Sequence, residues 1–126
     1  MKLFSIIRTL ISYCFILVVI LTFIIPFLLI ALLPTRFKFG NRWFFFLVYK
    51  FYKLIIFSLF VPVRIHGLEN IPQNEHVIFA GNHQSSIDGP ALGLILNGEP
   101  HSWLILDYYT KIPIIGIFVK RDSFFL

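Results

Sequence analysis

The first feature of the chain is a long apolar run. No charged residue occurs from Thr9 to Thr35, and most of these side chains are apolar. A membrane-spanning helix needs about 20 apolar residues, so the run is long enough to cross a bilayer. It is too long for the core of a cleaved signal peptide, and no small-residue cleavage pattern follows it. Pro26 predicts a kink or break. The run therefore predicts a retained anchor that either crosses once or dips in and returns.

A second apolar stretch covers residues 43–60 and differs by containing two lysines. Lys50 and Lys53 are three positions apart and therefore share one face of a helix. Tyrosines flank them, and tyrosine favours the membrane interface. We predict an interfacial helix, with its lysines at the lipid headgroups. A second spanning helix is the alternative, because two lysines within a span are costly but tolerated. Residues 1–60 are thus the predicted membrane-anchoring part.

The pattern changes at Val61, and residues 61–126 form the predicted second domain. Short apolar runs bounded by polar residues predict strands, with the two later runs buried. The expected strands are Val61–His66, Val77–Ala80 and Trp103–Leu106, and a helix is expected from Ala91 to Leu96, ended by Asn97-Gly98. Residues 111–116 predict a short helix or turn, and residues 119–126 look strand-like. Alternating strands and helices indicate an α/β fold, here the first half of an α/β sandwich.

The composition supports a membrane location. Charged residues make up 13% of the chain, against about 25% in soluble domains. The net charge is +5, and the charges are unevenly distributed. The first acidic residue is Glu69, so the part of the chain before it carries basic residues and no acidic ones. The basic residues flank apolar runs and form no stripe, which favours anionic headgroups and argues against nucleic acid as a partner. Cys14 is the single cysteine, so no disulfide can form within the chain.

The candidate chemistry lies directly after the predicted strand that ends at Ala80. His83 and Asp88 are five positions apart, too far to share a face of one helix. They can meet if His83 precedes a helix and Asp88 begins it, and Ser85 and Pro90 are consistent with a helix start here. Histidine is the natural base for removing a hydroxyl proton near neutral pH. A carboxylate on its other ring nitrogen would fix the tautomer.

Two simpler readings of these residues stay open. Ser85-x-x-Asp88 also fits a capping box, which is a purely structural helix start. A histidine followed five residues later by aspartate is a weak signal taken alone. The other histidines (His66, His76 and His101) show no spacing that would build a metal site with His83, so no metal is predicted.

The longer motif carries a resemblance to a known family. The stretch from Asn82 to Asp88 reads NHQSxxD and resembles the NHxxxxD signature of the glycerolipid acyltransferases. Residues 63–72 resemble that family's strand and turn before the motif, and residues 111–121 resemble the stretch after it. The chain is most similar to 1-acylglycerol-3-phosphate acyltransferases. The resemblance implies His83 as catalytic base and Asp88 as its partner.

The same resemblance sets expectations for substrates and location. It implies acyl transfer from acyl-CoA or acyl carrier protein to a lysophosphatidic acid-type acceptor in phospholipid synthesis, with no cofactor. Membrane lipid is the expected environment, with the active site on the cytoplasmic face.

Part of the family pattern is missing. The later family blocks, which supply an arginine and an FPEGT-like motif for the acceptor's phosphate, do not occur in this sequence. Arg121 is the candidate replacement, although it fits better as the basic residue that precedes the second block. We therefore expect this chain alone to be inactive. The alternative to an acyltransferase is a truncated, non-catalytic membrane protein that lacks the phosphate-binding half.

Overall fold

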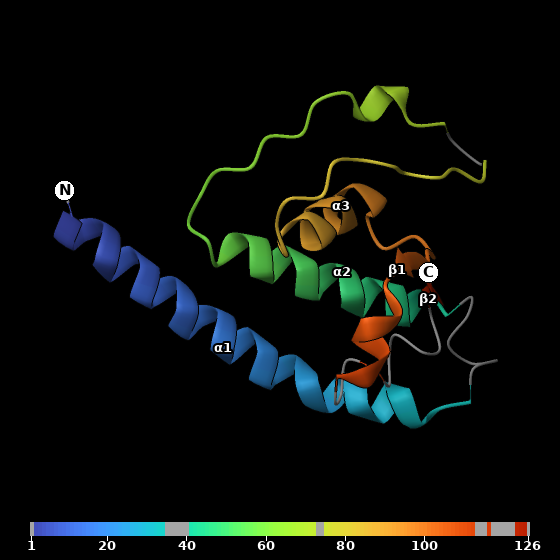
Figure 1. Cartoon of the computed structure of the whole chain (residues 1–126), viewed down its shortest axis with the longest axis horizontal. Coiled ribbons are helices and arrows are strands. Elements are labelled where there is room, and N and C mark those ends of the chain that lie inside the picture. The colour runs from blue at the N-terminus through green and yellow to red at the C-terminus, as the bar shows by residue number, and fades with distance from the viewer. Residues whose placement is uncertain (1, 35–40, 73–74, 113–115, 117–122, 126) are drawn as a thin grey trace.

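In the part of the chain that the structure describes, three α-helices form a stack with a small sheet at one end (Figure 1). The computed structural model describes residues 2–34, 41–72, 75–112, 116 and 123–125. Helix α1 (Lys2–Leu32) and helix α2 (Arg42–Phe57) run antiparallel as a hairpin. Helix α3 (Asp88–Leu96) packs on α2. In the layered arrangement α2 lies between α1 and α3.

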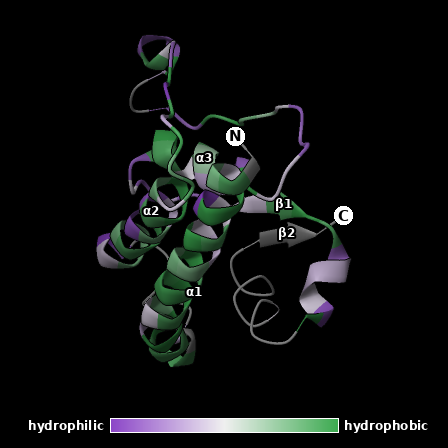
Figure 2. Ribbon diagram, turned by 90° about the vertical axis from the view of Figure 1, so that its left-hand side faces the viewer, coloured by the Kyte–Doolittle hydropathy of each residue, from purple (hydrophilic) through white to green (hydrophobic). Residues whose placement is uncertain are grey.

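Helix α1 is apolar around most of its circumference (Figure 2). The stretch from Leu3 to Ile30 is long and apolar enough to cross a membrane, and few of its side chains are buried within the protein. Most of its leucines and isoleucines face outward instead, as does Phe4 at 73% exposure. Pro26 predicted a kink or a break, and the helix continues through it, so a break does not occur. One proline removes one backbone hydrogen bond, and the apolar turns on both sides continue the helix.

Helix α2 begins at an asparagine cap and ends in a tight turn. The Asn41 side chain accepts a hydrogen bond from the Trp43 N–H at 2.9 Å, which satisfies one free donor of the first turn. The helix ends at Phe57, and residues 58–60 form a turn, so the helical part of the predicted 43–60 element is shorter at its end. Lys50 and Lys53 are both exposed.

The hairpin core forms where α1 and α2 cross. Val19, Phe23 and Ile55 make a buried cluster. The Phe51 ring lies 5.4 Å from that of Phe23, in the range of favourable aromatic pairs. Ile87, the residue before α3, also packs against this cluster. The loop that leads into α3 is therefore attached to the hairpin.

Helix α3 approaches α2 closely through a glycine. Gly93 is buried, and a Cβ atom there would lie only 2.0 Å from the Tyr52 ring. The helix ends at Asn97, which is left-handed, and Gly98 follows with φ of 85°. The predicted helix at 91–96 and its Asn97-Gly98 stop are confirmed, although α3 begins earlier, at Asp88.

The sheet is much smaller than predicted. Strand β1 (Trp103–Ile105) pairs in parallel with strand β2 (Ser123–Phe125), and these two strands form the sheet in the described residues. The short 3-10 helices η2 (Leu68–Asn70) and η3 (Asp107–Lys111) lie in the connections. The structure is mostly helical, so the predicted α/β sandwich is not confirmed.

Two of the three predicted strands are wrong. Residues 61–66 and 76–80 have no regular secondary structure, and both stretches are exposed. Ile78 is 96% exposed, although its run is apolar. A strand requires hydrogen bonds to a partner strand, and neither stretch is paired in the described part of the chain. The third, Trp103–Leu106, is confirmed as a strand for Trp103–Ile105, but Leu104 is exposed rather than buried.

We predict that Gly93→Ala destabilises the protein by about 1–3 kcal/mol, the usual cost of overpacking, because the new methyl group collides with Tyr52. Gly89→Ala is the matched control in the same helix, since a Cβ there meets no atom within 4 Å. It should cost less than Gly93→Ala, because the reduced freedom of the unfolded chain offsets the crowding of a new Cβ against the following Pro90. Thermal unfolding followed by circular dichroism in detergent measures both. Equal stability of the two variants would contradict the α2–α3 packing.

Candidate functional site

The NHQSxxD stretch forms a turn that folds back on the Asp88 carboxylate. Oδ2 of Asp88 accepts hydrogen bonds from the backbone N–H groups of Gln84 at 2.8 Å and Ser85 at 2.9 Å. The Ser85 carbonyl accepts the Asp88 N–H at 3.0 Å, which closes the turn. The Ser85 hydroxyl accepts the Ile87 N–H at 3.3 Å. This turn positions the start of α3.

The turn also brings His83 to the carboxylate. Nδ1 of His83 lies 3.0 Å from Oδ2 of Asp88. The sequence anticipated this contact between a histidine before the helix and an aspartate at its start. The helix-capping contacts and the His83–Asp88 contact therefore occur in the same turn. A capping role for Asp88 is thus compatible with its role as the partner of His83.

The charge state of Asp88 determines the tautomer of His83. Hydrogen bonds from the backbone of Gln84 and then Ser85 lower the pKa of Asp88, with a further contribution from His83. The carboxylate is therefore ionised near neutral pH and can only accept hydrogen bonds. Nδ1 of His83 must then carry the hydrogen, which leaves Nε2 with a lone pair. A ring held in this way can take a proton from a hydroxyl group.

The site is open to its surroundings. The His83 side chain is 71% exposed and that of Asp88 is 40% exposed. No group of three His, Cys, Asp or Glu side chains in the described ranges could hold a metal ion. Arg121, the candidate for phosphate binding, lies outside the described residues. The histidine of this pair can therefore serve as a general base. No phosphate-binding residue is assigned within the described part of the chain.

Two features that build the site could not be read from the sequence motif. The amide groups of Gln84 and Ser85 act through the backbone, so their side-chain identities give no signal. Ile87 fastens the turn to the hairpin core. Its apolar character next to Asp88 was the one available hint, because an apolar residue at a helix start must find a partner to bury it.

These features define a protein with an apolar helical hairpin and an exposed His–Asp pair at the start of a third helix that packs on it. Residues 62–126 match the model of the Acyltransferase family. The match covers just over half of the chain and includes the whole turn from His83 to Asp88, and the chain belongs to this family. Neither the comparison with curated proteins nor that with solved structures gives a match.

We predict that Asp88 titrates below its ordinary value of 3.8 and continues to do so in His83→Ala, because the Gln84 and Ser85 amides are the largest causes of the lowered pKa. Since the pKa is lower folded than unfolded, Asp88 stabilises the fold above its ordinary pKa. That contribution is lost as the pH falls through the folded value. Carbon NMR of the labelled carboxylate follows the titration. A return to the ordinary pKa in His83→Ala would assign the effect to the imidazole instead.

Proposed function

We propose that this chain carries the catalytic base of an enzyme that moves a fatty acyl group from acyl-CoA or acyl carrier protein to a lysophosphatidic acid-type acceptor in phospholipid synthesis. The observation that carries the proposal is the 3.0 Å contact between His83 Nδ1 and Asp88 Oδ2. Membership of the Acyltransferase family supports the reaction class. The particular substrates follow from the resemblance of the NHQSxxD motif.

The geometry suggests how the reaction would proceed. Nε2 of His83 takes the proton from the acceptor's hydroxyl as its oxygen attacks the thioester carbonyl. Asp88 stabilises the imidazolium that forms. Collapse of the tetrahedral intermediate breaks the carbon–sulfur bond and forms the ester. The imidazolium returns its proton to the departing thiolate, so the base is regenerated. The acceptor supplies the nucleophile, and the chain needs no nucleophilic serine or cysteine.

The packing of the helical hairpin suggests how α1 is oriented relative to the membrane. Ile87 packs against the buried cluster of Val19, Phe23 and Ile55, so the His83–Asp88 turn stands level with the middle of α1. If α1 crossed the bilayer along its normal, ionised Asp88 would lie near mid-depth, where a charge is costly. Lys53, level with the same part of α1, would share that cost. We therefore propose that α1 lies along the membrane plane among the acyl chains.

This orientation would place the site at the headgroups. Packed helices are spaced by about 8–10 Å, so two packing steps, α1 to α2 and α2 to α3, raise the site by at most roughly 20 Å above the α1 axis. Lipid acceptors would then reach His83 without leaving the bilayer. We place this surface on the cytoplasmic face, because the acyl donors implied by the resemblance occur there.

We predict that His83→Ala lowers acyl transfer by about 10²–10⁴-fold in the protein expressed from its own gene, the usual contribution of a general base. Asp88→Asn should cause a comparable loss, because an amide does not hold the correct tautomer. His76→Ala is the control, since His76 is an exposed histidine on the preceding loop. Transfer of radiolabelled acyl groups to lysophosphatidate in vesicles measures activity. Near-normal rates in a folded His83→Ala protein would contradict the proposal.

We predict that nitroxide labels at Leu3, Cys14 and Ile25 lie at one membrane depth. These three outward-facing positions are spaced by 11 residues, about three helical turns, so they share a face of α1. Cys14 is labelled in the parent chain, and the others in a Cys14→Ser background. Collision of the labels with oxygen and with a polar relaxing agent reports depth. A helix along the bilayer normal would instead separate successive labels by about 16 Å of depth.

A further inference from the structure

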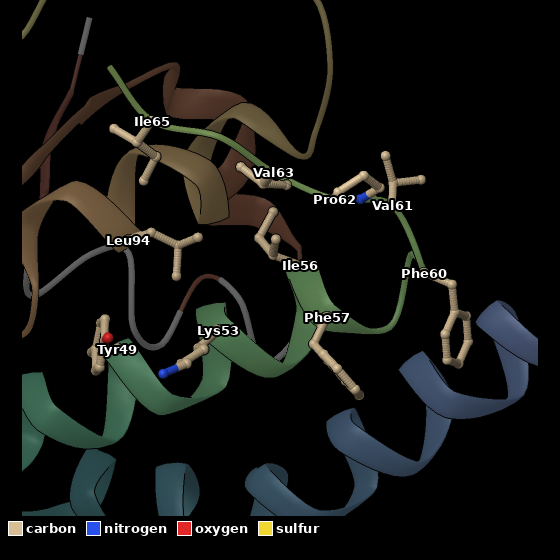
Figure 3. Close-up of a pocket in the computed structure, with 10 residues that line it drawn as sticks. All are labelled: Tyr49, Lys53, Ile56, Phe57, Phe60, Val61, Pro62, Val63, Ile65 and Leu94. Carbon is tan, nitrogen blue, oxygen red and sulfur yellow. The ribbon is translucent and has the colours of Figure 1, made fainter. Parts of the chain in front are cut away.

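A groove next to the end of α2 has no role in the proposed acyl transfer. It has a volume of about 570 Å³, within the range of roughly 300–1,000 Å³ typical of small-molecule sites. Its walls are the second half of α2, residues 60–65 and one residue of α3, Leu94 (Figure 3). His83 and Asp88 are not among its lining residues.

The lining of the groove is apolar with one cation. Val61, Val63 and Ile65 form one wall and are partly exposed, although all three are aliphatic. Lys53 is the lining residue that carries a charge, and its ammonium lies 5.9 Å from the centre of the Tyr49 ring, which also lines the groove. An apolar channel with a lysine matches a ligand that has an alkyl chain and an anionic head.

The groove is continuous with the apolar surface of α1. Phe57 and Phe60 line it, and each ring also lies 6.1 Å from the ring of Phe15 on α1. Phe60 has φ of 51°, a left-handed conformation that is costly for a bulky residue. This conformation turns the chain sharply after α2. A lipid chain lying against α1 could therefore extend past these two rings into the groove.

We infer that this groove binds one acyl chain of an anionic bilayer phospholipid, with the headgroup on Lys53. The occupant comes from the surrounding membrane and is distinct from the substrate at His83. Attraction of a headgroup phosphate to Lys53 supplies charge complementarity, and burial of the chain covers the exposed aliphatic wall. The inference rests on the membrane-seated hairpin of the proposed function, but not on the acyl transfer.

Photo-crosslinking tests this site in the full chain, reconstituted in phosphatidylcholine vesicles with trace phosphatidylglycerol that carries a diazirine in its acyl chain. Mass spectrometry maps the adducts, and those on the groove are expressed relative to those on α1. We expect adducts on residues 61–65 and Leu94, at a higher ratio than with a phosphatidylcholine probe. Flotation with the vesicles is measured separately, so failure of membrane seating is distinguished from failure of the groove.

Two lysines give the matched comparison. Lys53→Gln should lower the groove ratio about fivefold, the effect of roughly one lysine on an anionic surface. Lys50→Gln should leave it unchanged, because Lys50 is exposed on the same helix but does not line the groove. Its ammonium lies over the Phe46 ring instead, 4.9 Å from the centroid. Val63→Asn should also lower the ratio, and it leaves Lys53 intact should Lys53→Gln fail to fold.

Three results would overturn the inference: equal ratios for the two probes, equal losses in the two lysine variants, or absence of groove adducts in chains that float with vesicles. Labelling by a lysophosphatidate probe alone would also overturn it, because the groove would then belong to the acceptor.

Discussion

The three hydrogen-bonding groups gathered on Asp88 Oδ2 hold the site together. Two backbone amides, from Gln84 and Ser85, and the imidazole of His83 converge on this one oxygen. The amides lower the pKa of the carboxyl, so the aspartate remains an acceptor and dictates where the histidine carries its hydrogen. Because Asp88 is also the first residue of α3, the same carboxylate lies at the start of the helix and sets the tautomer of His83.

The rest of the fold connects that atom to an apolar hairpin. Ile87 packs on the core shared by α1 and α2, and Gly93 lets α3 lie directly against Tyr52. The site thus has little freedom to move relative to α1. If α1 is immersed among acyl chains, the height of His83 above them is fixed by two layers of helix packing. An enzyme with lipid substrates needs this, because positioning a hydroxyl beside its base supplies much of the catalysis.

Features set by neighbouring residues were predicted correctly from the sequence. Features that depend on packing or pairing between distant elements were not. The end of the helix at 91–96 followed from Asn97-Gly98, whose left-handed backbone terminates α3. The strand at 77–80 did not form, because an apolar run becomes a buried strand only when partners pair with it and cover it. The His83–Asp88 contact was foreseeable from the motif. The amides of Gln84 and Ser85 were not, since any residue presents the same N–H. Gly93 gave no signal either, because its role depends on Tyr52 from another helix.

The most direct test of this account is the tautomer of His83 itself. Heteronuclear NMR of the labelled imidazole, recorded with the ring neutral, distinguishes the two nitrogens. We expect a hydrogen on Nδ1, bonded to Asp88, and an unprotonated Nε2. In Asp88→Asn the ring should shift toward a mixture of tautomers. A hydrogen on Nε2 in the parent protein, with Nδ1 unprotonated, would contradict the assignment of His83 as a base oriented by Asp88.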